Sequence, residues 1–237
     1  MSGRQRDQGG EVTVKLYMHP VSNTSRPIRM FIQDNNLPVE EEVVDLMTGA
    51  HHQEPYVSVN PNRQVPTLDD DGFVLYESSA ILKYLADKFD LPAYPKDLKK
   101  RAKVNELMDW FNTHFYHDYA YGVVYPQVFP HHKRPTDEIQ KGTIEWGKEK
   151  TRTWLSVLND HILGKGNKYL TGDDVTIADY FGAALLTCGD PIRTEFKTYP
   201  NVQAWLDRMA GTKSWKSCNE ALWGFRDYVK DQPFETL

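Results

Sequence analysis

The spacing of apolar residues divides this chain into two regions: strand and helix patterns alternate in the first, and only helical spacing is found in the second. β-branched and aromatic residues fill Val12–Tyr17, which predicts a strand. Ile28, Phe31 and Ile32 then recur at i, i+3 and i+4, the spacing of a helix with one apolar face. Pro27 falls in the first turn of that helix, where its missing N–H is tolerated.

The next elements are short and close together, and they complete a small β/α region with the order β-α-β-(α)-β-β-α. After Asn35-Asn36 ends the helix, the pattern predicts a strand at Val39–Leu46, an irregular segment with room for a short helix at Thr48–Val59, strands at Thr67–Asp69 and Phe73–Tyr76, and a helix at Glu77–Lys88. Asp70-Asp71-Gly72, between the last two strands, is typical of a hairpin turn.

Beyond this region no strand pattern recurs, and apolar residues keep helical spacing. We expect helices at 99–121, 137–163, 176–187, 201–210 and 214–221. The pattern therefore predicts an α/β domain at residues 12–88, a linker at 89–97 and an all-α domain at 98–237, preceded by a mobile tail at 1–11 that is polar and rich in glycine.

Composition narrows the class of protein. The formal net charge is -5, from 28 basic and 33 acidic residues, which argues against a nucleic-acid binder because phosphate neutralisation requires a basic face. No apolar run approaches the ~20 residues that span a bilayer, and the polar start lacks the apolar core of a signal peptide. The only cysteines, Cys188 and Cys218, form no CxxC motif, so we expect a reduced, cytoplasmic protein without membrane attachment.

Three hydroxyl side chains lie between the first strand and the first helix. Ser22, Thr24 and Ser25 fall within four residues, in the sequence His-Pro-Val-Ser-Asn-Thr-Ser-Arg-Pro. Serine and threonine are ordinary helix N-caps, so the cluster alone fits a well-capped helix as well as a chemical site.

Three further motifs allow both structural and functional interpretations. Val65-Pro66 precedes a strand, and Pro66 either starts an edge strand or forms a cis bond that leaves the backbone of Val65 free for an extended peptide. Glu77-Ser78 joins a strand to a helix, where it either caps the helix or presents a carboxylate, a hydroxyl and free N–H groups to a ligand. Thr176 and Asp179 have the spacing of a capping box, which favours a structural role.

In this order and spacing, the motifs resemble those of the glutathione S-transferase superfamily, from Val12 to about Trp223. Val44-Asp45-Leu46, Gly49 and His51 resemble the theta class or a bacterial relative of it. The resemblance implies a thioredoxin-like N-terminal domain, an all-α C-terminal domain and a homodimer. It also implies glutathione as co-substrate, activated as a thiolate that attacks a small hydrophobic electrophile by conjugation, dehalogenation or peroxide reduction.

By matching position, the resemblance assigns the hydrogen bond to the thiolate to Ser22, with Asn23 as a second donor and Thr24 and Ser25 as helix starters. It assigns the other glutathione contacts to His51, Gln64, Val65, Pro66, Glu77 and Ser78. Gln64 departs from the pattern, because theta-like sequences often carry lysine at that position.

We expect an electrophile pocket between the two domains, lined by Phe111, Phe115, Tyr116 and Tyr119 of the first long C-terminal helix. Tyr121, Tyr125 and Phe129 lie in what reads as a loop that could fold over the pocket. His114 and His117 are one turn apart but have no matching acid or cysteine, so we expect no metal.

Two other functions compete with this interpretation. Ser22 to Ser25 has the spacing of a CxxC motif with hydroxyls at both ends, but without a thiolate nucleophile this site cannot carry out thiol–disulfide exchange. A non-catalytic binding or partner module on the same scaffold is the remaining alternative, since fold does not guarantee function.

Overall fold

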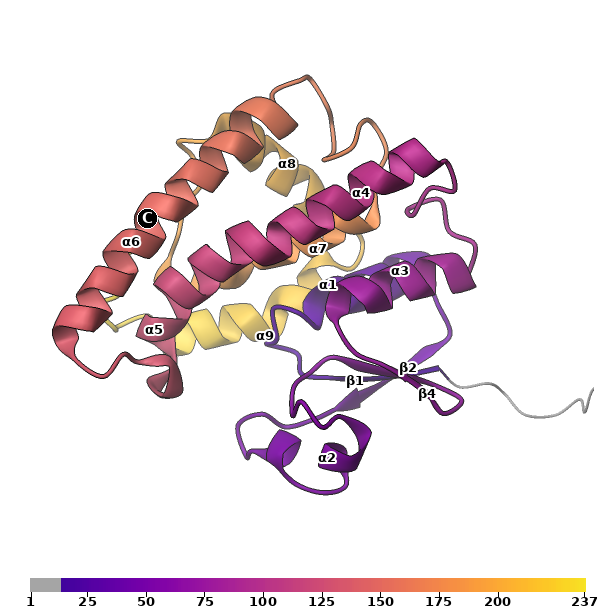
Figure 1. Cartoon of the computed structure of the whole chain (residues 1–237), viewed down its shortest axis with the longest axis horizontal. Coiled ribbons are helices and arrows are strands. Elements are labelled where there is room, and N and C mark those ends of the chain that lie inside the picture. Colours follow the sequence, from indigo (N-terminus) through magenta and orange to yellow (C-terminus); the bar gives the residue numbers. More distant parts are fainter. Residues whose placement is uncertain (1–13) are drawn as a thin grey trace, which may run out of the picture.

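The computed structural model describes residues 14–237. The tail expected at residues 1–11, and the first two residues of the first predicted strand, lie outside the described residues. The described chain forms a small β/α part, drawn in indigo and purple, against which a larger all-helical part packs (Figure 1). The α/β-plus-all-α fold predicted from the sequence is therefore confirmed.

The N-terminal part is built on a four-stranded mixed sheet with the strand order β2-β1-β3-β4. Its strands are β1 (Val14–Met18), β2 (Val39–Val43), β3 (Thr67–Asp70) and β4 (Phe73–Leu75). β1 pairs in parallel with β2 and antiparallel with β3, and β3 and β4 form the predicted hairpin. The carboxyl ends of β1, β2 and β4 therefore meet the amino end of β3 at one edge of the sheet, which brings the segments carrying the candidate motifs together.

Helices cover both faces of this sheet. α1 (Arg26–Asn35) and α3 (Ser78–Lys88) lie on the face toward the helical part, and η1 (Ala50–His52) and α2 (Tyr56–Val59) lie on the other side (Figure 1). Pro27 lies in the first turn of α1, and Asn36, at a left-handed φ of 50°, ends it, as predicted.

Residues 89–97 contain no helix or strand, and the chain beyond them is helical. The elements are α4 (Leu98–Trp110), η2 (Phe111–Val124), α5 (Tyr125–Val128), η3 (Pro130–His132), α6 (Asp137–Ser156), η4 (Val157–Ile162), α7 (Ile177–Leu186), η5 (Thr187–Ile192), α8 (Pro200–Ala210) and α9 (Trp215–Tyr228). η2 and η4 are π-helical continuations, so α4 to α5 and α6 to η4 form the two long helices that the pattern predicts.

The last helix extends past its predicted end at Ala221 to Tyr228. Leu222 is buried in the core, and its packing outweighs the poor helix propensity of Gly224. Among the described residues, none of the helices combines the length and the apolar character that crossing a membrane requires.

α7 lies at the centre of the helical part, and every one of its residues is buried. Thr176 and Asp179 form the predicted capping box at its start. The Asp179 carboxylate also accepts hydrogen bonds from the N–H of Leu170 at 2.9 Å and the indole N–H of Trp205 at 3.0 Å. Because these partners lie outside α7, Asp179 ties the helix start to two other segments and has a structural role.

α1 docks the two parts onto each other. The Ser214 N–H donates to the Asp34 carboxylate at 2.8 Å, and Lys213 donates to the side chain of Asn36 at 2.6 Å. Arg26, in the first turn of the same helix, donates to the carbonyl of Ala184 in α7 at 2.9 Å. The buried apolar residues of both parts form one continuous core.

Candidate functional site

The loop between β1 and α1 holds the predicted hydroxyl cluster. Thr24 Oγ1 donates to the carbonyl of Val65 at 3.1 Å, and Ser22 Oγ lies 3.1 Å from Thr24 Oγ1. A threonine hydroxyl has only one proton, and in Thr24 the carbonyl of Val65 takes it. The Ser22 hydroxyl is therefore the donor in the Ser22–Thr24 contact.

The oxygen of Ser22 also serves as an acceptor for the start of α1. The Ser25 N–H donates to Ser22 Oγ at 3.2 Å, while the hydroxyl of Ser25 is buried and has no partner among the described residues. Ser25 occupies the N-cap position of α1, in line with the prediction, but its side chain makes no capping hydrogen bond. Thr24 bonds to another loop and does not cap the helix. Sequence spacing could not show which of three neighbouring hydroxyls reaches the helix.

Asn23 has both ends of its side-chain amide engaged. Its Oδ1 accepts from the Arg26 guanidinium at 2.7 Å, and its Nδ2 donates to the hydroxyl of Tyr125 at 3.0 Å. Tyr125 in turn shares a hydrogen bond with Tyr116, and both rings are buried. Asn23 thus links the loop after β1 to the helical part.

The Val65–Pro66 peptide bond is cis, as one of the two sequence interpretations proposes. Its surroundings differ in part from that expectation, because the carbonyl of Val65 already accepts from Thr24. The Val65 N–H has no backbone or side-chain partner within residues 14–237. The carbonyl of Gln64 is fixed by the Tyr56 hydroxyl and the Asn60 amide, and the Gln64 side chain is exposed.

Glu77 and Ser78 lie at the same edge of the sheet, between β4 and α3. Glu77 is exposed and adopts a positive φ of 67°, and Ser78 is the first residue of α3. Burial, and then the charge of Glu77, raise the pKa of Tyr121 in η2.

His51 lies in η1, which follows β2 at this edge. Its ring is 3.9 Å from that of His52 between centroids, and its Nδ1 has no partner in the described part of the chain. Burial, followed by the neighbouring histidines, lowers the pKa of His51. The ring is therefore neutral at pH 7 and can take part in hydrogen bonds but not as a fixed cation.

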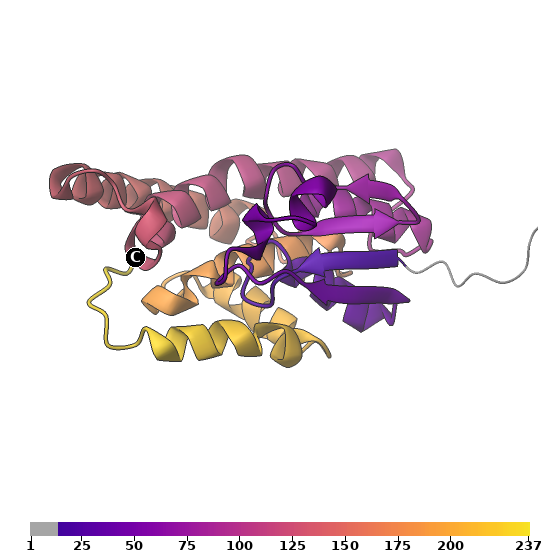
Figure 2. The same ribbon diagram turned by 90° about the horizontal axis from the view of Figure 1, so that it is seen from below.

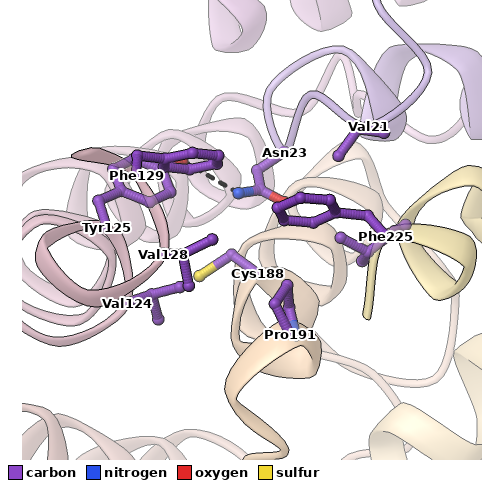
Figure 3. A pocket seen from close by; sticks show the side chains of 10 residues that line it. Val21, Asn23, Val124, Tyr125, Val128, Phe129, Cys188, Pro191 and Phe225 are labelled. Carbon is purple, nitrogen blue, oxygen red and sulfur yellow. Dashed lines mark hydrogen bonds between the residues drawn. The ribbon is translucent and has the colours of Figure 1, made fainter. Parts of the chain in front are cut away.

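A small cavity with about 20 Å³ of free space, room for about one water molecule, lies between the loop after β1 and the helical part (Figure 3). It is lined by Val21, Asn23, Val124, Tyr125, Val128, Phe129, Cys188, Pro191, Leu222 and Phe225. Most of these side chains are apolar, and the Asn23 amide projects among them toward Tyr125 (Figure 3). The cavity therefore has an apolar wall next to a hydrogen-bond donor.

The pocket residues expected from the sequence lie elsewhere. Phe111, Phe115 and Tyr119 are fully buried in the core of the helical part, and Tyr116 lies behind Tyr125. Their aromatic spacing is therefore that of the buried face of a long helix.

The cavity wall comes instead from positions just after that seam and from η5 and α9. Tyr125 and Phe129, expected in a loop, lie in and just after the short helix α5. Leu222 and Phe225 come from α9, and no local signal separates them from ordinary core residues.

The two cysteines offer no redox site. Both are free and buried, and burial raises the pKa of the Cys218 thiol to about 11 and that of Cys188 further. In residues 14–237, no group of three or more His, Cys, Asp or Glu side chains is arranged to hold a metal ion.

Two family models match the chain: the glutathione S-transferase N-terminal domain over residues 16–93 and the glutathione S-transferase C-terminal domain over residues 123–212. The sequence is 31% identical to glutathione S-transferase theta-1 of Mus musculus over 204 residues, which cover 84% of this chain and 82% of the relative. It is 31% identical to glutathione S-transferase theta-2 of Homo sapiens over 215 residues, which cover 88% of this chain and 85% of the relative.

The fold is also similar to those of solved glutathione transferase structures. Human glutathione transferase theta-2, in complex with glutathione and an unknown ligand, has a TM-score of 0.80 at 27% identity, with 94% of this chain and 93% of that chain covered. The apo form of human glutathione S-transferase T1-1 has a TM-score of 0.79 at 26% identity, with 93% of both chains covered.

Proposed function

The chain belongs to the glutathione S-transferase family and is a glutathione transferase, and we propose that Ser22 is the residue with which it stabilises glutathione as a reactive thiolate. The thiolate then attacks an electrophilic carbon, forms a carbon–sulfur bond and displaces halide or opens an activated ring or double bond. A free thiol has a pKa near 8.5, so the enzyme must lower that value to work at neutral pH.

The hydrogen bonds of Ser22 carry this proposal. Its hydroxyl is oriented as a donor, because Thr24 gives its own proton to Val65. Its oxygen accepts from the Ser25 N–H, and a hydroxyl that accepts a hydrogen bond becomes a stronger donor. Turning the proton from Thr24 to a thiolate exchanges a neutral hydrogen bond for a charge-assisted one, which is about twice as strong.

The start of α1 adds to this effect. The N–H groups of Asn23 and Thr24 have no acceptor within residues 14–237, and both lie just ahead of the helix. Unpaired N–H groups at a helix N-terminus favour a negative charge. Ser22, Asn23 and the helix start therefore supply donors from three directions to one sulfur atom.

The tripeptide itself fits the edge of the sheet. We propose that the unpaired N–H of Val65 and its carbonyl, which keeps a second lone pair, bind the cysteinyl part of glutathione beside Pro66. Exposed Glu77 and buried Ser78, at the start of α3, take the γ-glutamyl ammonium and carboxylate. His51 and Gln64 face the glycine end, the first as a neutral hydrogen-bonding ring.

The electrophile binds in the cavity beside Asn23 in this proposal. Its mostly apolar wall favours small hydrophobic electrophiles, for conjugation, dehalogenation or peroxide reduction. Phe111, Phe115 and Tyr119 support that wall from the core without lining it.

The overall arrangement follows the family in two further respects. We propose domains at 12–88 and 98–237 joined by the linker at 89–97, and a homodimer in a reducing, cytoplasmic compartment. Light scattering on a sizing column tests the dimer. A monomer at micromolar concentration contradicts it.

The function is tested by retention on immobilised glutathione together with titration of the thiolate absorbance of bound glutathione. We expect retention and a thiol pKa at least one unit below the free value near 8.5, with conjugation of small haloalkanes or epoxides. Retention with an unshifted thiol pKa would establish the non-catalytic binding module instead. Absence of both retention and conjugation would refute glutathione binding.

A further inference from the structure

Arg26 is a charged side chain with no exposed surface, placed in the first turn of α1 directly behind the site. Its guanidinium donates to Thr187 Oγ1 at 2.9 Å, to the Ala184 carbonyl at 2.9 Å and to Asn219 Oδ1. These three acceptors belong to the helical part, so they hold the guanidinium in one orientation. The fourth acceptor is Asn23 Oδ1, at 2.7 Å, on the loop of the site.

The contact with Asn23 decides which way its amide points. A guanidinium only donates, so it can bind the oxygen end of the amide and not the nitrogen end. The nitrogen end must then face the opposite direction, toward the Tyr125 hydroxyl at 3.0 Å and the cavity. One Nδ2 hydrogen goes to Tyr125, and the second has no acceptor in the described part of the chain.

We propose that Arg26 is a positioning residue for the reaction: by binding Oδ1, it keeps the second Nδ2 hydrogen of Asn23 directed at the sulfur of glutathione. This inference rests on the proposed thiolate function. It assigns the work of Arg26 to the fixed geometry of its planar fork, which can donate on several sides at once, and not to its charge alone.

Several ionisable groups of the helical part act on Arg26. They are Asp190 and Cys188 in η5, Tyr125 in α5 and Tyr116 in η2. Burial lowers the pKa of Arg26 and the Asp190 carboxylate opposes this, yet an arginine stays protonated throughout the working range. The opposing charge of Asp190 weakens the direct field of the guanidinium, which leaves the orientation of Asn23 as its main route to the sulfur.

The test is a double-mutant cycle on the thiol pKa of enzyme-bound glutathione, with Arg26→Lys, Arg26→Met and Asn23→Ala. Lysine keeps the charge but lacks the fork, and methionine removes both. We expect each single variant to raise the thiol pKa by roughly 1–2 units, the contribution of one hydrogen bond to a charged acceptor. We expect the combined variant to be no worse than Asn23→Ala alone.

Asp34→Ala is the matched control. Asp34 lies on the same helix and also binds the helical part, through the Ser214 N–H, but farther from the site. If Arg26 had a purely structural role, substitutions of Arg26, Asn23 and Asp34 would all lower the unfolding midpoint and leave the thiol pKa of the folded enzyme unchanged. We expect Asp34→Ala to behave in that way and the Arg26 variants not to.

A second measurement uses the unaltered protein, in case the Arg26 variants do not fold. Nuclear magnetic resonance of the Asn23 side-chain amide, assigned by its loss in Asn23→Ala, should show one slowly exchanging hydrogen, that bound to Tyr125. The inference is overturned by a wild-type thiol pKa in either Arg26 variant, by additive effects in the cycle, or by fast exchange of both hydrogens. A wild-type enzyme that leaves the thiol pKa unshifted refutes the proposed function instead.

Discussion

Replacing Ser22 with alanine tests the centre of the proposed mechanism. The change removes the hydroxyl donor and also one of two acceptors of the Ser25 N–H, which keeps its bond to the Ser22 carbonyl at 3.2 Å. The second loss should therefore cost less than removal of an N-cap, which costs about 0.5–2 kcal/mol of stability. The first loss acts on the bound thiol, because a hydrogen bond to a charged group contributes about 1.5–3 kcal/mol.

These values set the size of the expected effect. At 1.36 kcal/mol per unit, the pKa of the bound thiol should rise by about 1–2 units. At a pH below the thiol pKa of both enzymes, the thiolate fraction then falls about 10- to 100-fold, but a more basic thiolate is more nucleophilic, with a Brønsted slope of about 0.4–0.5. The net loss in kcat/KM at that pH should therefore be roughly 3- to 15-fold.

The pH profile of kcat/KM distinguishes this from a general defect. Removing the donor raises the pKa, so the deficit is present below the wild-type pKa and disappears as the pH rises through the pKa of the variant. Thr24→Val is the control, since it removes the bond to Val65 but leaves the Ser22 proton free for the sulfur. If Ser22→Ala lost the same factor at every pH, or Thr24→Val raised the thiol pKa as much, Ser22 would not be the donor.

Further predictions concern packing, charge and the cavity. A Cβ on Gly189 would lie 1.6 Å from the Tyr119 hydroxyl, so Gly189→Ala should lower the free energy of unfolding in urea by about 1–3 kcal/mol. A Cβ on Gly224 would have no atom within 4 Å, so Gly224→Ala should leave that free energy unchanged or raise it. A larger loss of stability for Gly224→Ala than for Gly189→Ala would contradict the packing. Burial raises the pKa of Asp70, but hydrogen bonds from its lysine and tyrosine partners on α3 outweigh this and keep that pKa below its ordinary value. Asp70→Asn should therefore be less stable than the wild type at pH 7, and the difference should vanish once the pH falls below the pKa of Asp70 in the folded protein. A difference in urea midpoints that does not change with pH would argue against this. Phe225→Trp should narrow the cavity and lower kcat/KM for larger electrophiles before smaller ones, and an equal loss for all sizes would place the electrophile elsewhere.

Much of the fold could be predicted from the sequence because its signals are local. The period-two pattern of β1, the proline and asparagine at the two ends of α1, and the hairpin glycine each act within a few residues. The capping box of α7 was recognisable for the same reason. The end of α9 was missed, because the buried side chain of Leu222 overrides the local preference of Gly224.

The site was harder to predict from the sequence because it depends on contacts between distant segments. Three adjacent hydroxyls have the same local propensity, and only the position of Val65 shows which of them gives its proton away. Likewise, the aromatic spacing of Phe111 and Phe115 indicates a buried face, but not whether that face meets a ligand or another helix. The cavity wall combines side chains from near residues 21, 125, 190 and 225, which no single stretch of sequence records.

The partners of Arg26 bear on the order in which the protein is made. The arginine leaves the ribosome early, but its acceptors belong to residues 184, 187 and 219, which follow much later. Until α9 has been synthesised, the guanidinium lacks part of the shell that makes its burial tolerable. The loop that leads into α1 therefore reaches its final shape only near the end of translation, so that a nascent chain holding the whole sheet still lacks a finished site.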